Sequence, residues 1–368
     1  MKSYYCLYGI IIAMFTMEHL IYKREGVLLQ IHQKRMIALT WISVIALALM
    51  VGFRALNMGQ DLPGYFFYCD IIKKDSWMVF YEHWKNQRYA NFELGFCFMA
   101  KILSSICDNH QILLVGSAFA FILPLGYYIC RCSSNYLVSI LAFLALPYFT
   151  TMFSAIRQSM AIGIMMLAFV ALKGNKTISY FIFITVASLF HKSAIFMIVL
   201  YLAYRVRMSR STMLIVGIGS SMAFYVLKRP IFYVLIRLVK PERSAFEINK
   251  SGGLFLGLVM LYIMCVCLCD MTNDVVRGFT NLLLVACLMQ SLSSLHNLVG
   301  RMTWYPMLSV IVLVPEMLRN ISWKTRYGKE IATIAMCTIL VVGGLYFISN
   351  EANGSAVPYV PCWRYVAE

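Results

Sequence analysis

Residues 154–161 read Ser-Ala-Ile-Arg-Gln-Ser-Met-Ala, which places an arginine and a glutamine inside a stretch that otherwise has the composition of a membrane helix. Further along the chain, residues 191–194 read His-Lys-Ser-Ala and repeat the pattern. A charged side chain at bilayer depth is costly, so it normally has a partner or a function there. The two interruptions therefore mark the candidate functional site as well as the breaks in the predicted helices.

The composition around these interruptions is that of a membrane protein. Of 368 residues, 61% are hydrophobic and 13% are charged, whereas soluble domains carry roughly 25% charged residues. We therefore predict an all-α, polytopic integral membrane protein. The 32 basic and 16 acidic residues give a net charge of +16. Many basic residues fall in short loops between apolar runs, where they set orientation in the membrane, so we expect no nucleic-acid partner.

The apolar runs predict a single domain over residues 1–368, a bundle of about twelve transmembrane helices. The candidate spans are 4–21, 36–53, 111–130, 134–152, 155–172, 177–190, 193–206, 212–227, 253–269, 278–295, 302–318 and 331–348. One further apolar run, 94–107, is short and contains Lys101. Whether this run crosses the membrane decides the orientation of every later span.

The basic residues favour an arrangement in which 94–107 lies in or on the outer leaflet. Several basic loops then face the cytoplasm, as the positive-inside rule requires; they lie at 23–35, 131, 173–176, 205–210 and 319–329. Both termini lie outside in this topology, which also leaves two larger outer loops. One is 54–93, with mixed charges and aromatic residues, and the other is the basic segment 228–252, in which 231–239 is typical of an interfacial helix.

The candidate spans 177–190 and 193–206 are each about 21 Å long at 1.5 Å per residue, shorter than the roughly 30 Å hydrocarbon core. The turn between them should therefore lie below the outer surface, against protein or a wet cavity. The turn at 150–154 should lie similarly. Ser154 and Ser193 each precede an apolar helical run, and we predict that both are helix N-caps.

In this topology both helices begin on the outer side, and a third helix begins there at Arg301. Helix N-termini carry partial positive charge and free N–H groups. With Arg157, Lys192 and Arg301 beside them, they predict an oxyanion site for the phosphate of a lipid headgroup or lipid diphosphate. Simpler roles stay open: Arg157 could snorkel to the interface, His191 could be a turn histidine, Lys192 could be an interfacial anchor and Arg301 a flanking charge.

Three charged residues of the outer loop, Arg54, Asp61 and Glu93, lie close to predicted membrane boundaries. A carboxylate there could orient an acceptor hydroxyl or act as a general base. Alternatively, Arg54 and Asp61 pair with each other. The aromatic residues between 65 and 84 fit either an interfacial belt or stacking on sugars. Nucleotide-binding, dinucleotide-binding and zinc-binding motifs are absent from the sequence, so we expect neither cofactor nor metal.

Five short elements occur in a recognisable order. They are Phe53-Arg54 with Gly59-Gln60-Asp61 and Tyr65, then Glu93-Leu94-Gly95-Phe96, Ile156-Arg157-Gln158, His191-Lys192-Ser193-Ala194, and Arg301 with Tyr305. This order resembles the EpsG family of Wzy-like polysaccharide polymerases, over about Arg54 to Pro315. Two positions depart from the family pattern: Leu62 stands where a small polar residue is frequent, and Leu94 where proline is common.

The resemblance implies a glycosyltransferase of the bacterial plasma membrane. It would transfer a growing undecaprenyl-diphosphate-linked glycan onto the next lipid-linked repeat unit at the outer face, in capsule, exopolysaccharide or O-antigen synthesis. Related lipid-dependent glycosyltransferases often work without metal and use arginines to stabilise the departing diphosphate. A chain-length regulator and a flippase are the implied protein partners. The alternatives are a lipid-linked oligosaccharide flippase or other transporter, and a membrane acyltransferase that modifies the glycan.

The predicted site residues follow from both lines of reasoning. The catalytic candidates are Arg157, His191, Glu93 and Asp61. The substrate-binding candidates are Arg54, Gln158, Lys192, Arg301 and Tyr305.

Overall fold

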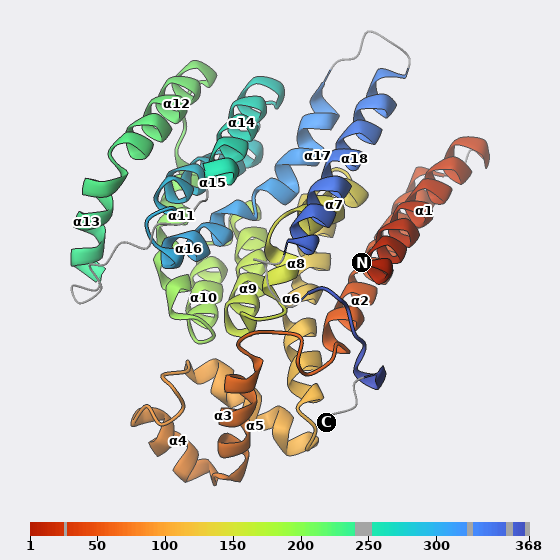
Figure 1. The fold of residues 1–368 in the computed structure, drawn as a ribbon. Coiled ribbons are helices and arrows are strands. Elements are labelled where there is room, and N and C mark those ends of the chain that lie inside the picture. The colour runs from red at the N-terminus through yellow and green to blue at the C-terminus, as the bar shows by residue number, and fades with distance from the viewer. Residues whose placement is uncertain (26–27, 240–251, 322–326, 351–355, 365–368) are drawn as a thin grey trace. The chain divides into compact units, whose positions relative to one another are not determined.

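The computed structural model describes residues 1–25, 28–239, 252–321, 327–350 and 356–364. Over these residues every regular element is helical, and extended pairing is limited to one isolated antiparallel bridge between Arg54 and Pro361. The all-α prediction is therefore confirmed for the described part of the chain (Figure 1).

The chain forms two compact units, Met1–Ile195 with Ile334–Glu368, and Phe196–Thr333. The long helices of the first unit pack side by side, α2 against α6, α6 against α9 and α9 against α10. Burial ranks them, because 72% of the apolar window of α9 is buried but only 28% of that of α1. Helix α9, which begins just after the first interruption, is thus the most deeply buried of the long helices of this unit. Its helices are α1 (Lys2–Glu25), α2 (Leu29–Gly52), α6 (Gln111–Cys132), α7 (Tyr136–Ala145), α8 (Tyr148–Thr151), α9 (Ile156–Lys173), α10 (Thr177–Ser188) and three shorter ones described below.

The second unit is built around α15, which contacts α11, α12, α14, α16 and α17. Asn281 of α15 donates its amide N–H groups to the carbonyls of Ala203 and Val206, at 3.0 and 2.9 Å, and so holds the end of α11. The helices are α11 (Val199–Arg205), α12 (Arg210–Val226), α13 (Lys228–Val239), α14 (Gly252–Leu268), α15 (Asp274–Leu292), α16 (Asn297–Met307) and α17 (Val310–Asn320). The last helix, α18 (Gly328–Ser349), begins in this unit and ends in the first.

Only part of the predicted set of about twelve membrane-spanning helices is supported by the described helices. Six described helices are long and apolar enough to cross a membrane, namely α1, α2, α6, α9, α15 and α18, and α12 with α13 makes a seventh if that pair, bent by 80°, is one span. The prediction of about twelve is not confirmed, because several apolar runs are broken. The run 134–152 divides at Pro147, which lacks an N–H for the helix ladder, and the run 302–318 divides between α16 and α17.

The segment predicted as the first outer loop, 54–93, is largely helical. It contains α3 (Leu62–Lys74) and α4 (Trp77–Lys85), and α3 packs against α5 (Leu94–Ile106). Figure 1 shows these three helices grouped at one end of α6. The buried ammonium of Lys101 donates to the carbonyls of Ile72, Lys73 and Asp75, and so ties α5 to the end of α3. At 13 residues, α5 is about 20 Å long and too short to span.

The second predicted outer loop, 228–252, contains a helix where the sequence predicts an interfacial one. This is α13, Lys228–Val239, and residues 240–251 lie outside the described part of the chain. The orientation with both termini outside stays a prediction.

Candidate functional site

The first interruption is a non-helical turn just before α9. Residues 152–155 lie between α8 and α9 in turn conformation, where the sequence predicts a turn. The predicted N-cap is wrong: the cap position is Ala155, with no side-chain hydrogen bond. Ser154 instead accepts a hydrogen bond from the N–H of Gln60 at 3.1 Å, so its hydroxyl links two distant segments.

The second interruption begins where α10 ends at Ser188. Lys192–Ile198 form a 3₁₀ helix, and α11 begins at Val199, so the prediction that Ser193 caps an α-helix is wrong. The start of α5 packs directly on this break, because the Gly95 N–H donates to the Leu189 carbonyl at 2.8 Å. A Cβ at Gly95 would lie 2.8 Å from that same oxygen. Glycine at 95 therefore lets the residue before α5, Glu93, reach the turn at 191–192.

The two breaks and the start of α5 bring together four predicted site residues, Glu93, Arg157, His191 and Lys192, here named the Arg157 cluster. Arg157 Nη1 donates to Glu93 Oε2 at 2.5 Å. The other carboxylate oxygen, Oε1, accepts the backbone N–H of Lys192 at 3.1 Å, and His191 Nδ1 lies 3.6 Å from it. Glu93 is 5% exposed. Its buried carboxylate therefore connects the start of α5 to α9 and to the turn at 191–192.

Aromatic rings line the Arg157 guanidinium. Its Cζ lies 4.5 Å from the centre of the Phe92 ring, and Nε donates to the Tyr65 hydroxyl at 3.4 Å. Nη2 has no hydrogen-bond partner among the described residues. The side chain is 22% exposed. Arg157 therefore keeps donors available for an oxyanion while Glu93 and the rings fix its plane.

The carboxyl of Glu93 stays ionised over the physiological range. Burial raises its pKa, but the neighbouring His191 ring, the Arg157 charge and the Lys192 N–H outweigh that effect and lower the pKa to about 2. A carboxylate with this pKa is a weak proton acceptor at neutral pH. The geometry is that of a group that orients Arg157 and faces His191.

Arg54, a predicted substrate-binding residue, is fully buried, with 0% of its surface exposed. Its guanidinium donates to four backbone carbonyls rather than to an open cavity. The alternative that Arg54 pairs with Asp61 is wrong, because no ion pair joins them in the described part of the chain and Asp61 is exposed before α3. Burial lowers the pKa of Arg54 to about 9, so the group is still charged at neutral pH.

The remaining predicted site residues lie in three places. Gln158 is 2% exposed on α9, directly after Arg157. The side chain of Lys192 is exposed, and no ion pair joins it to the described residues. Arg301 and Tyr305 belong to α16 in the second unit, where Arg301 is exposed and Tyr305 is fully buried. Since α16 begins at Asn297, the prediction that a helix starts at Arg301 is wrong.

Two aromatic residues at this site, Tyr65 and Phe92, are not among the predicted site residues, although Tyr65 belongs to the recognised sequence elements and to the aromatic residues expected at an interface or on sugars. Tyr65 follows Asp61 by one helical turn on α3, and Phe92 directly precedes Glu93. Their positions next to charged candidates are the sequence signal that could have identified them. The described residues contain no cluster of three or more histidine, cysteine, aspartate or glutamate side chains that could hold a metal ion.

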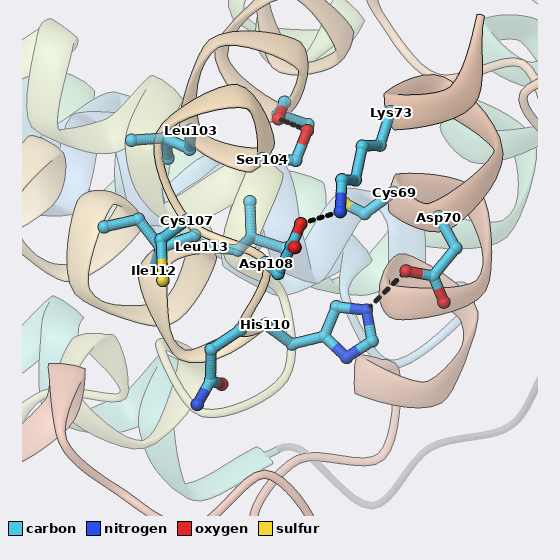
Figure 2. A pocket seen from close by; sticks show the side chains of 12 residues that line it. Cys69, Asp70, Lys73, Leu103, Ser104, Cys107, Asp108, His110, Ile112 and Leu113 are labelled. Atoms are coloured by element: carbon cyan, nitrogen blue, oxygen red, sulfur yellow. Dashed lines mark hydrogen bonds and ion pairs between the residues drawn. The ribbon is translucent and has the colours of Figure 1, made fainter.

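A small hollow lies elsewhere in the first unit, between α3, the end of α5 and the start of α6. Figure 2 shows its two pairs, Lys73 facing Asp108 and His110 facing Asp70. The His110 Nε2 to Asp70 Oδ1 distance is 2.8 Å. These polar groups bind one another and tie the 107–110 turn to α3, so the hollow is less suited to a charged substrate than the Arg157 cluster.

Comparison with known proteins gives a family match. The model described as the EpsG family matches residues 37–361, which include all four members of the Arg157 cluster. No curated protein and no solved structure matches.

Proposed function

The chain belongs to the EpsG family, whose members are Wzy-like polymerases, and on this basis we propose that it polymerises lipid-linked repeat units of a bacterial polysaccharide. The substrate is an undecaprenyl-diphosphate-linked oligosaccharide. The reaction takes place at the outer face of the plasma membrane, and the product is a capsule, exopolysaccharide or O-antigen chain.

The proposed reaction is a glycosyl transfer with lipid diphosphate as leaving group. The bond between the reducing-end C1 of the growing glycan and the diphosphate oxygen breaks, and the electron pair leaves with the diphosphate. A hydroxyl oxygen on the non-reducing sugar of the next repeat unit forms the new bond to C1. The hydroxyl proton passes to a base. The lipid diphosphate is itself the leaving group, so the step needs no nucleotide sugar.

The observation that carries this proposal is the Arg157 guanidinium, oriented by Glu93 and by aromatic rings while Nη2 keeps its donors. Charge builds up on the diphosphate oxygens as the C1–O bond breaks. A preoriented cation at that point stabilises this charge and lowers the activation barrier. Each such donor typically raises the rate by about 10²–10³-fold. Lys192, whose backbone N–H binds Glu93 and whose side chain is exposed, and Arg301 stay predicted further cations for the diphosphate.

Among the candidate bases the geometry favours His191. Glu93 has a pKa of about 2 and is committed to Arg157 and the Lys192 N–H. Its carboxylate lies on the Nδ1 side of His191, at 3.6 Å. A carboxylate there favours the tautomer with a proton on Nδ1, which leaves Nε2 as the acceptor. Asp61, exposed at the start of α3, is the other candidate base.

The remaining candidates have supporting roles in this scheme. Gln158, buried directly after Arg157, and Tyr305, buried on α16, stay predicted substrate-binding residues. A chain-length regulator and a flippase are the protein partners that such a reaction needs, one to limit the product and the other to supply the substrate. The scheme uses neither metal nor cofactor.

Deleting the gene in its native host tests the proposal. Lipid-linked and surface glycans are separated on a gel, and a single repeat unit should replace the ladder. Wild-type protein should restore the ladder, and an Arg157→Ala variant that inserts and accumulates normally should not. An unchanged ladder in a strain without a second polymerase contradicts the proposal. Repeat units retained on the cytoplasmic side would instead indicate a flippase.

A further inference from the structure

We propose that Arg54 is a positioning residue: it holds the turn at 152–154 in place and so fixes where Arg157 lies one turn later. The inference rests on the proposed function, because it assigns Arg54 a role in the same reaction. It replaces direct contact with substrate, the role that the sequence suggests for this arginine.

The four hydrogen bonds of Arg54 join two segments that are distant in sequence. On its own side, Nη1 donates to the Val51 carbonyl at 2.6 Å and Nε to the Met58 carbonyl at 3.0 Å. On the other side, Nη2 donates to the carbonyls of Met152 and Phe153, both at 3.2 Å. The guanidinium carbon also lies 5.1 Å from the centre of the Phe153 ring. One planar side chain thus binds the end of α2, the following loop and the turn before α9.

The partners of Arg54 explain why it is suited to this role and not to substrate binding. All four acceptors are backbone carbonyls, and no carboxylate in the described part of the chain pairs with it. A buried charge without a counter-ion is costly unless hydrogen bonds satisfy it. The rigid fork of arginine can bond carbonyls on both of its sides at once, whereas the single ammonium of lysine cannot.

Two further contacts act on the same turn. Gly59 has a φ of +153°, and a Cβ there would lie 2.0 Å from the Phe153 carbonyl oxygen. The Gln60 N–H donates to Ser154 Oγ at 3.1 Å. The segment 54–60 therefore fits closely over 152–154 at several points.

The C-terminal segment holds 54–60 from its other side. The Ala55 N–H donates to the Val360 carbonyl and the Cys362 N–H to the Phe53 carbonyl, both at 2.8 Å. Arg54 is thus held by backbone pairing on one side, while its side chain holds the 152–154 turn on the other.

The turn leads directly to the reacting group, because α9 begins at Ile156 and Arg157 is its second residue. A shift of about 1 Å in a catalytic group can cost on the order of 10²-fold in rate. If Arg54 acts by placing Arg157, its loss should reduce kcat more than it raises KM. If it held the diphosphate itself, KM for the donor should rise most.

The first experiment measures initial polymerisation rates of the full-length protein in nanodiscs with lipid-linked repeat units, varying the donor. Arg54→Lys should lower kcat at least about 10-fold with KM within about 3-fold of wild type. Arg88→Lys, an exposed arginine on the same unit, should change neither. Full kcat in Arg54→Lys, or a rise in KM without a fall in kcat, overturns the positioning role. Absence of polymer with wild-type protein overturns the proposed function itself.

The second experiment asks whether the effect passes through Arg157. In an Arg157→Lys background with residual activity, adding Arg54→Lys should lower kcat by less than about 3-fold, because there is no longer a guanidinium to position. If Arg54→Lys costs the same factor in both backgrounds, its role is general stability and the proposal is wrong.

A third experiment compares two glycine variants and tests the proposal even if the Arg54 variants do not accumulate. Gly59→Ala pushes on the Phe153 carbonyl, whereas Gly64→Ala adds the same methyl where nothing lies within 4 Å. Gly59→Ala should reproduce the loss of kcat and Gly64→Ala should not. Ser154→Ala, which removes only the acceptor for Gln60, should give a smaller loss of about 3-fold. Full kcat in both Gly59→Ala and Ser154→Ala overturns the proposal.

Discussion

Arg54 and Arg157 are both arginines at the edge of an apolar helix, yet their surroundings differ. Arg54 follows α2, is fully buried and gives its donors to four neutral carbonyls. Arg157 begins α9, keeps 22% of its side chain exposed, and bonds one carboxylate and one hydroxyl. Both side chains are charged, so charge alone does not distinguish their roles. An arginine that binds a ligand keeps unused N–H donors, whereas an arginine that only positions the backbone has none.

The largest expected effect is on catalysis, from Arg157→Ala. The substitution removes the only guanidinium of the Arg157 cluster, so the polymerisation rate should fall about 10³-fold. Glu93 would lose one ion-pair partner but keep the Lys192 N–H and His191, so the unfolding temperature should fall, by less than for a change at Arg54. Rates are measured on protein in nanodiscs, with Arg88→Ala as the control. A rate within 10-fold of wild type would contradict the assignment of Arg157 as the arginine that binds the diphosphate.

The next effect is on stability, from Arg54→Met. Methionine fills much of the space but leaves the carbonyls of Val51, Met58, Met152 and Phe153 without their donor. Unsatisfied buried carbonyls are costly, so the variant should lose about 3 kcal/mol of stability. Thermal unfolding in detergent measures the loss, and Arg157→Ala serves as the comparison. Equal stability of the two variants would show that the difference in hydrogen bonding has no energetic weight.

Acid should weaken the Arg157 cluster in a defined range. The pKa of Glu93 falls from the ordinary 4.5 to about 2 in the folded protein. Its contribution to stability is therefore fully present above pH 4.5 and is lost as the pH falls from 4.5 toward 2. Because Arg157 is partly hydrated, we expect a loss of about 2 kcal/mol, below the full value of that shift.

Unfolding temperatures between pH 6 and pH 3 test this range. Wild type should lose stability on acidification more steeply than Glu93→Gln, which has no proton to gain at this position. Glu82→Gln, at an exposed position on α4, should behave as wild type. Parallel curves for wild type and Glu93→Gln would mean that the Glu93 carboxylate is not held by Arg157 in solution.

Sequence reasoning located the two backbone breaks and the residues of the Arg157 cluster, because a charge in an apolar run is visible in the sequence. It did not find the partners of Arg54, since backbone carbonyls have no sequence signature. It also assigned Ser154 and Ser193 to caps, because the preference for serine before a helix reveals neither the Gln60 partner of Ser154 nor the 3₁₀ helix that contains Ser193. The predicted number of spans is not confirmed for a similar reason, because hydropathy does not show where an apolar run breaks.

The smallest expected effect sharpens the comparison at a third cation, Lys192. Its backbone N–H holds Glu93, but its ammonium is exposed and has no ion pair with the described residues. Lys192→Ala keeps the backbone bond and removes only an exposed charge, so the rate should fall by about 5-fold, much less than for Arg157→Ala. The loss should shrink at high salt, because an exposed charge is screened. A loss as large as that of Arg157→Ala, independent of salt, would mean that Lys192 contacts the diphosphate directly and that exposure alone does not separate the two roles.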